Sequence, residues 1–189
     1  DHRDLHSFPT RRSSDLIPYV HILTNKSKLP FRTEYEIPEM PGSYRIGAVA
    51  GAYAHFPGEE VLIINTGTTI TYDFLSGKKY KGGNISPGLT MRFRALHKFI
   101  DNLPLESVSG DYTFPGRNTA DALRAGVITG VVYEINEYIR TFKKEQKKLI
   151  VVITGGDSDF LRDRIRYKIR HIPELVMDGL NNILEYNAK

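Results

Sequence analysis

Two continuous apolar runs, each followed at once by a polar turn that contains glycine, constrain this sequence most. Residues 61–64 (Val-Leu-Ile-Ile) lead into 65–69 (Asn-Thr-Gly-Thr-Thr), and residues 149–153 (Leu-Ile-Val-Val-Ile) lead into 154–157 (Thr-Gly-Gly-Asp). Short apolar runs rich in β-branched residues are typical of strands buried on both faces. The sequence therefore predicts an α/β fold whose strands end in turns with main-chain N–H groups that can cradle an anion.

Further patterns predict the rest of the sheet and its helices. Residues 70–74 alternate with period 2 and predict a second strand, and residues 80–83 predict a third short strand or loop. A helix is expected after Gly88 with its apolar residues on one face, and a longer one after a cap at Asn118 or Thr119. Two more helices are expected, one near Ser158 and one at the C-terminus.

The long helix carries a second pattern beside its apolar stripe. Ala122, Gly126 and Gly130 repeat at every fourth position. Residues four apart share one face of a helix. We therefore expect something to pack very closely against this face.

Composition excludes several classes of protein. Of the 189 residues, 40% are hydrophobic and 25% are charged, which is typical of a folded globular chain. No apolar run approaches the roughly 20 residues of a membrane-spanning helix, so we expect no membrane role. The absence of Cys excludes disulfides and thiol chemistry, fits a reducing compartment and predicts a cytoplasmic protein. The net charge of +4 is too small to indicate nucleic-acid binding.

The first sixteen residues differ from the rest of the chain. They show no period of 2 or 3.6 and resemble the translation of a sequencing adapter. We therefore interpret residues 1–16 as a foreign or artefactual tail and expect the natural chain to begin near Ile17.

Each glycine turn taken alone is ambiguous. Residues 65–69 also fit a threonine-rich hairpin turn, and residues 154–157 also fit a plain turn from strand to helix. Neither GxxxxGK[ST] nor a GxGxxG after a strand is present. Residues 82–89 (Gly-Gly-Asn-Ile-Ser-Pro-Gly-Leu) are more specific, because three glycines and a proline before a helix predict an unusual backbone of functional use. His97, the lysines of 143–148 and the basic run 162–170 fit ordinary structural roles.

The order of these motifs is more specific than any one of them. Tyr35 is followed by Pro38, Glu39, Gly42 and Arg45, and then come segments 65–68, 82–89, 118–126 and 154–157. In this order, from about residue 29 to the C-terminus, the sequence resembles a type III pantothenate kinase. Residues 82–89 and the C-terminal end resemble the Bacteroidetes branch of that family in particular.

The resemblance implies an actin-like, acetate-and-sugar-kinase superfold. It has two ribonuclease-H-like lobes, each a mixed sheet with flanking helices, and ATP binds between them. Residues 17–58 would be the remnant of an incomplete first lobe, and residues 59–189 the second lobe with its C-terminal helix.

The resemblance also implies an activity. A transferase of this kind moves a phosphoryl group from ATP with Mg²⁺ to the primary hydroxyl of pantothenate, the first step of coenzyme A biosynthesis. A monovalent cation, K⁺ or NH₄⁺, would be required, and a homodimer interface would help to build the pantothenate pocket.

Site residues follow by position from the resemblance. Arg45 would hold the pantothenate carboxylate, for which a planar guanidinium is suited. The other substrate contacts would be Tyr35, Gly42, Ser43 and Thr119. The ATP phosphates would lie at Gly67, Thr68, Gly155 and Gly156.

The sequence departs from the family pattern at three places. Tyr44 stands where the resemblance implies an Asp as general base, and a phenol is a poor replacement near neutral pH. Asn65 stands where the family has an Asp that binds the monovalent cation. The family's acidic, glycine-containing phosphate loop has no counterpart before Ile17.

Two other functions stay open beside the kinase. Tyr44 and Asn65 favour a catalytically dead pseudokinase, or an accessory factor for transcription, of the same family. A kinase of the same superfold with another alcohol as acceptor is the third alternative. Tyr35 and Arg45 argue against it, because they match the pantothenate pocket in particular.

Overall fold

A computed structural model describes residues 19–35 and 42–188. One mixed sheet organises them, with the strand order β1-β4-β3-β2-β5-β6. The central strands are β2 (Glu60–Thr66), β3 (Thr69–Ser76), β4 (Lys79–Pro87) and β5 (Leu149–Thr154), and the short edge strands are β1 (Arg32–Thr33) and β6 (Arg170–His171). The pairs β2–β3 and β3–β4 are antiparallel, whereas β2–β5 is parallel.

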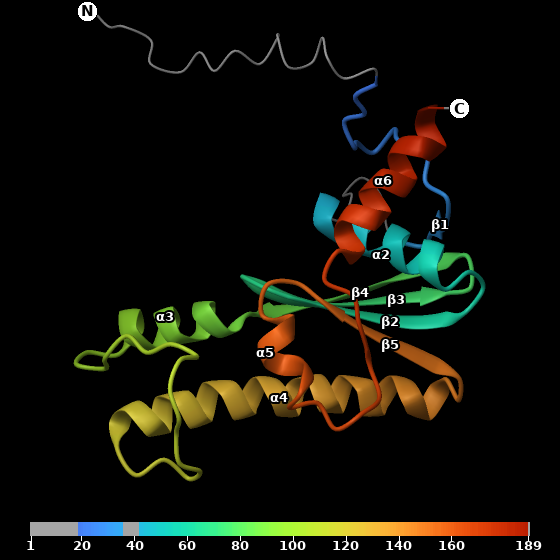
Figure 1. The fold of residues 1–189 in the computed structure, drawn as a ribbon. Helices are drawn as coiled ribbons and strands as arrows, with labels where there is room; N and C mark the ends of the chain where they lie inside the picture. The colour runs from blue at the N-terminus through green and yellow to red at the C-terminus, as the bar shows by residue number, and fades with distance from the viewer. Residues whose placement is uncertain (1–18, 36–41, 189) are drawn as a thin grey trace, which may run out of the picture.

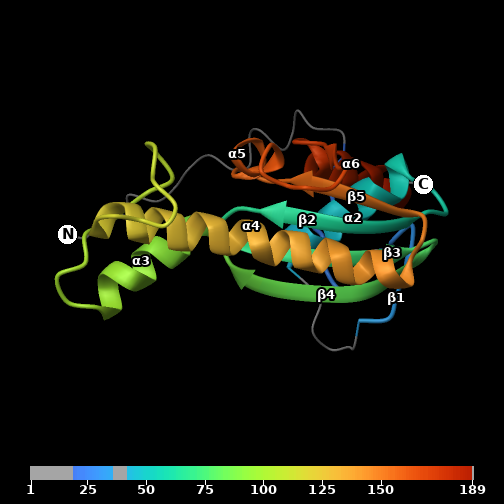
Figure 2. The same ribbon diagram turned by 90° about the horizontal axis from the view of Figure 1, so that it is seen from below.

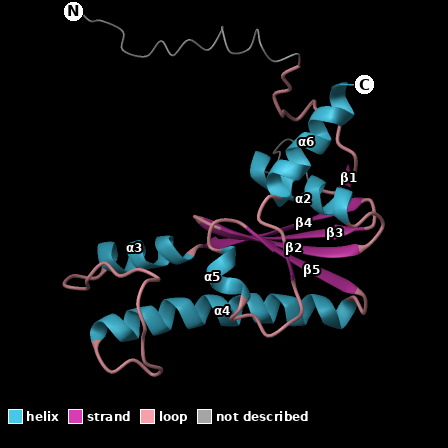
Figure 3. Cartoon of the chain, viewed as in Figure 1, coloured by secondary structure: helices cyan, strands magenta, loops and turns pink. Residues whose placement is uncertain are grey.

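Helices cover both faces of this sheet (Figures 1 and 3). α2 (Ser43–His55) and α6 (Leu175–Ala188) lie on one face. On the other face lie α4 (Thr119–Glu145) and α5 (Ser158–Arg162), and α3 (Leu89–Phe99) continues from β4. α3 and the first half of α4 extend beyond the sheet (Figure 2).

The alternation of side chains along the strands creates two cores. Leu62 and Ile64 of β2 face the core beneath α4, whereas Val61 and Ile63 face the core beneath α2 and α6. All four side chains are fully buried, which explains why this run is apolar at every position.

Glycines allow α2 and α6 to cross at close range. A Cβ on Gly179 of α6 would overlap the carbonyl oxygen of Gly47 in α2, and one on Gly51 would overlap the carbonyl oxygen of Leu175. The small residues of α2 therefore serve helix packing. The expected boundary between residues 58 and 59 falls between α2 and β2, and the division into two lobes stays a prediction.

Most of the predicted elements are confirmed. Strands form at 61–64, 70–74 and 149–153, and Asn118 caps α4, its side chain accepting a hydrogen bond from the Asp121 N–H at 2.9 Å. The apolar stripe predicted for the helix after Gly88 runs through Ile100 and Leu103, but the helix ends at Phe99, so these two residues lie beyond it. The sixteen residues predicted as a foreign tail lie outside the described residues, as do Pro38 and Glu39 of the first motif.

The prediction for residues 80–89 needs correction. They form a long strand through Pro87, not a short strand followed by a glycine loop. A Cβ on Gly83 would overlap the carbonyl oxygen of Tyr72, and one on Gly88 would overlap that of Gly67. These glycines permit close packing of β4 against its neighbours, which gives them a structural reason.

Candidate functional site

The two glycine turns lie against each other at the carboxyl ends of β2 and β5. β2 and β5 are parallel neighbours, so the turns at their carboxyl ends meet. Gly155 has φ +96°, and a Cβ there would overlap the carbonyl oxygen of Thr66 and lie 2.5 Å from Oδ1 of Asn65. The Asp157 N–H donates to the same Thr66 oxygen at 3.1 Å. Only glycine fits this contact without strain.

The turns present main-chain N–H groups. Within the hairpin the Gly67 N–H donates to the carbonyl oxygen of Thr69 at 3.0 Å, and the Gly88 N–H donates to that of Thr68 at 3.0 Å. These bonds fix the tip of the hairpin. The N–H groups of Thr68, Gly155 and Gly156 donate to no other residue in the part of the chain that the structure describes. Such groups are suited to binding an anion.

A cavity of about 460 Å³ opens beside the hairpin. It is lined by Tyr44, Asn65, Gly67, Thr68 and Thr69. The structure thus brings together four residues that the sequence singled out for three different roles: Tyr44, Asn65, Gly67 and Thr68. Every lining side chain is uncharged in its ordinary state.

The start of α2 supplies Tyr44 to this cavity. Gly42 is the N-cap of α2, and a Cβ on it would lie 2.9 Å from the Tyr44 ring. Ser43 begins the helix and is exposed. The Tyr44 side chain is 41% exposed, so its phenol is accessible.

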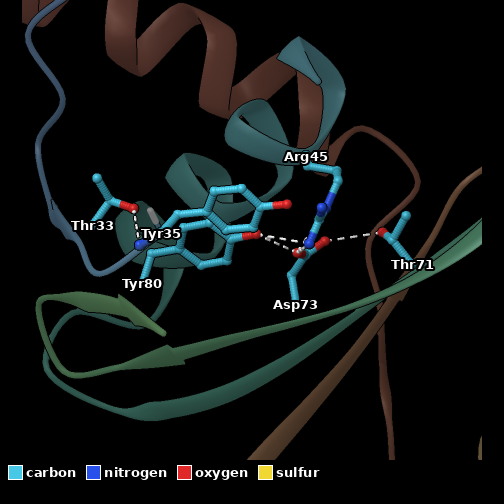
Figure 4. Close-up of polar contacts among 6 residues, drawn as sticks. All are labelled: Thr33, Tyr35, Arg45, Thr71, Asp73 and Tyr80. Atoms are coloured by element: carbon cyan, nitrogen blue, oxygen red, sulfur yellow. Dashed lines mark hydrogen bonds and ion pairs between the residues drawn. The ribbon is translucent and has the colours of Figure 1, made fainter. Parts of the chain in front are cut away.

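Arg45, the next residue, points into the protein and forms a buried ion pair (Figure 4). Its Nη2 donates to Oδ1 of Asp73 at 2.6 Å and its Nε donates to the same oxygen at 3.0 Å. Tyr80 also donates its hydroxyl to this oxygen, and Thr71 donates to Oδ2 at 2.9 Å. Burial acts to lower the pKa of Arg45, but the hydrogen bond and charge of Asp73 outweigh it, so the pKa is raised.

Tyr35 completes this cluster. Its ring stacks on Tyr80 with 6.1 Å between centroids, and the guanidinium carbon of Arg45 lies 5.6 Å from the Tyr35 ring centroid (Figure 4). The structure thus brings Tyr35 and Arg45 together. The sequence reasoning missed Asp73, and its role for Arg45 in substrate binding stays a prediction.

Thr119 lies elsewhere in the chain. It begins α4, and it lines a separate cavity of about 670 Å³ between α3 and α4 with Arg92, Leu96, Leu123 and Gly126 among others. Figure 1 shows this end of α4 far from α2. Thr119 is not among the residues that line the Tyr44 cavity.

The face of α4 that carries small residues is open. Gly126 and Gly130 would each accept a Cβ with no atom of the described residues within 4 Å. The predicted close packing is found at Ala122, whose backbone would overlap a Cβ on Gly116, and not at Gly126 or Gly130 among the described residues. No local signal distinguishes packing inside one chain from packing between two.

Glu134 connects α4 to the sheet and to α3, and the sequence reasoning missed it. It accepts hydrogen bonds from Tyr72, Ser86 and Arg92. Burial acts to raise the pKa of Glu134, but these hydrogen bonds outweigh it and hold the pKa below its ordinary value. The carboxylate thereby fixes Arg92 at the cavity that Thr119 lines.

Metal ligands are sparse in the ranges 19–35 and 42–188. No group of three or more His, Asp or Glu side chains lies together in these ranges. None of the helices in these ranges combines the length and the hydrophobicity that a membrane crossing requires. Asp157 lies in the second turn, where its N–H donates to the carbonyl oxygen of Thr66. Burial raises the pKa of its carboxyl group.

Solved structures resemble this fold. A Campylobacter jejuni protein assigned to the Baf family of transcriptional activators has a TM-score of 0.57 at 23% identity, covering 84% of this chain and 69% of its own. A Sinorhizobium meliloti protein described as a 2-dehydro-3-deoxygalactonokinase has a TM-score of 0.50 at 14% identity, covering 75% and 57%. The mixed sheet with helices on both faces defines an actin-like, acetate-and-sugar-kinase fold, as predicted.

Sequence comparison identifies the family within that class. The family model for type III pantothenate kinase matches residues 10–141. The type III pantothenate kinase of Bacteroides fragilis (strain YCH46) is 43% identical over 166 residues, covering 87% of this chain and 68% of its own. That of Phocaeicola vulgatus is 40% identical over 181 residues, covering 95% and 75%. The chain belongs to the type III pantothenate kinase family.

Proposed function

We propose that this chain transfers the terminal phosphoryl group of ATP to the primary hydroxyl of pantothenate. The product is 4'-phosphopantothenate, and the reaction is the first step of coenzyme A biosynthesis. The observation that carries the proposal is the gathering of Tyr44, Asn65, Gly67 and Thr68 around one cavity in a member of this family. We place the reaction in the cytoplasm, which the absence of Cys supports.

The glycine turns would hold the phosphates of ATP. The open N–H groups of Thr68, Gly155 and Gly156 support this role, because phosphoryl transfer depends mostly on positioning and charge stabilisation. Mg²⁺ would arrive with ATP. It is usually held through phosphates, waters and one or two carboxylates, so the absence of a larger acidic cluster among the described residues is compatible with it.

The start of α2 would present the acceptor. Tyr35, Gly42 and Ser43 would contact pantothenate. Arg45 is buried and held by Asp73, so it would position Tyr35 for the substrate and not hold the carboxylate directly. Tyr44 would lie nearest to the reacting hydroxyl. Its phenol is a weaker general base near neutral pH than a carboxylate, so we expect slow turnover.

Thr119 would act from a second copy of the chain in a homodimer. Two features of α4 support this assignment: the open glycine face at Gly126 and Gly130, and the neighbouring largely apolar cavity that Thr119 lines. Close helix packing between two copies would bury this face, as small residues allow backbones to approach closely.

A monovalent cation fits the residues poorly. At the position of the expected cation ligand, Asn65 offers an amide oxygen without charge, and the cavity lining contains no carboxylate. A buried cation needs an opposite charge or a full set of oxygen ligands to offset its desolvation. We therefore assign no step of the reaction to this cation.

The test is pantothenate phosphorylation by the chain as it stands and by Tyr44→Asp. A general base contributes about 10²–10⁴ in rate, so Tyr44→Asp should raise kcat by a factor in that range. Failure of both proteins to phosphorylate or bind pantothenate contradicts the proposal. Binding of pantothenate and ATP with no turnover in either protein would favour the pseudokinase alternative, which Tyr44 motivates.

A further inference from the structure

We propose that Asn65 contacts the phosphate chain of the nucleotide directly, and that nucleotide binding at this cavity needs no monovalent cation. The inference rests on the proposed function and deepens it. Its starting point is the chemistry of the cavity wall, where five neutral residues meet and no carboxylate takes part.

Asn65 is held rigidly at the end of β2. It lies in register with Thr71 of β3 and with Thr154 of β5, so its backbone is fixed from both sides. Its Oδ1 lies so close to Gly155 that a Cβ there would be only 2.5 Å away. The side chain lies between the two turns and lines the cavity, so its amide N–H₂ can donate to a bound phosphate.

An amide and a carboxylate at this position make opposite demands on a bound phosphate. A carboxylate repels the phosphate oxygens, and a cation between the two anions relieves that repulsion. An amide N–H₂ attracts the same oxygens by donating hydrogen bonds. With Asn65 present, the reason for an intervening cation is gone.

The surrounding groups act in the same direction. The N–H of Thr68 and the hydroxyls of Thr68 and Thr69 are further neutral donors at the cavity. The Asp157 carboxylate is in the adjoining turn, but it is not among the residues that line the cavity. Phosphate would therefore meet hydrogen-bond donors at the cavity wall and no fixed negative charge.

The experiment measures the affinity for ATP with Mg²⁺ by calorimetry in potassium, ammonium and tetramethylammonium chloride at equal ionic strength. The unsubstituted chain should bind ATP equally well in all three salts. Asn65→Asp should weaken binding roughly 5–1000-fold in tetramethylammonium, the range between one unit-charge repulsion in bulk water and one near a protein surface. Potassium should restore much of that loss.

Two controls keep the test interpretable. Asn65→Ala removes the amide without adding charge, so it should weaken binding equally in every salt. Asp157→Asn should, like the unsubstituted chain, bind ATP equally well in all three salts. Circular dichroism and thermal unfolding of each variant report whether it still folds.

Each outcome decides something. Tighter binding by the natural chain in potassium than in tetramethylammonium overturns the inference while leaving the kinase proposal intact. If Asn65→Ala binds ATP as tightly as the unsubstituted chain, Asn65 does not contact the phosphate chain. Absence of ATP binding in every salt overturns the proposed function, and this inference with it.

Discussion

The Arg45 guanidinium and the Asp73 carboxylate form a buried ion pair, with 2.6 Å between Nη2 and Oδ1, that ties the first turn of α2 to the centre of the sheet. Arg45 adjoins Tyr44, which lines the candidate cavity. The pair therefore anchors the turn of α2 that carries Tyr44.

Removing one partner of this pair should destabilise the fold strongly. Arg45→Met leaves the Asp73 carboxylate buried without its cation, which typically costs about 3–5 kcal/mol. Urea unfolding measures this loss. Glu137→Gln, which breaks the exposed pair between Glu137 and Arg140, is the control and should change nothing measurable. Equal effects of the two substitutions would show that the Arg45 pair is not structural.

Gly155→Ala should damage both stability and ATP binding. The residue has φ +96° and a Cβ there would overlap Thr66, so the cost should be at least about 1–3 kcal/mol. Gly156→Ala is the matched control, because nothing lies within 4 Å of its Cβ position. Chemical denaturation and ATP calorimetry on both variants test the prediction. A Gly155→Ala variant as stable as Gly156→Ala would contradict the close contact of the two turns.

The open face of α4 should be the dimer interface. Gly126→Glu places a charge on that face and should shift the protein towards monomer in sedimentation-velocity experiments, without lowering monomer stability. Gly126→Ala should leave the dimer largely intact and stabilise the helix by up to about 1 kcal/mol. A Gly126→Glu protein that sediments like the natural chain would place the interface elsewhere.

Acid should weaken the Glu134 network. The folded-state pKa of Glu134 lies below its ordinary 4.5, so its stabilisation is present above that value and disappears as the pH falls through the folded pKa. Glu134→Gln should therefore flatten the loss of unfolding free energy below about pH 4.5. The pKa of Asp157 is raised by burial, so its ionised carboxylate destabilises the folded state. Asp157→Asn should therefore increase stability at neutral pH. If the unfolding free energy of Glu134→Gln falls with acid as steeply as that of the unsubstituted chain, the prediction is contradicted.

Local patterns predicted the elements well, because their causes are local. Apolar runs produced β2 and β5, and Asn118 caps α4 through its own side chain. The close packing of Gly83 and Gly88 was not predicted, because the atoms that crowd them belong to Tyr72 and Gly67 on other segments. A functional role of residues 82–89 stays a prediction.

The buried cluster was not predicted, although a signal for it exists. Asp73 alternates with Thr71 and Leu75 along β3, so its side chain shares a face with residues that are fully buried. A carboxylate on a buried face requires a cation or several donors. The sequence identifies that need, but it does not identify Arg45, 28 positions earlier on another element, as the partner.

The most direct test of the account is the location of ATP on the chain. Amide resonances followed by ¹H–¹⁵N NMR during titration with ATP and Mg²⁺ report it. The account predicts the largest shifts at Thr68, Gly155 and Gly156. Shifts concentrated instead at Arg32 and Lys78, which line a separate cavity beside α6, with Thr68 unchanged, would contradict it.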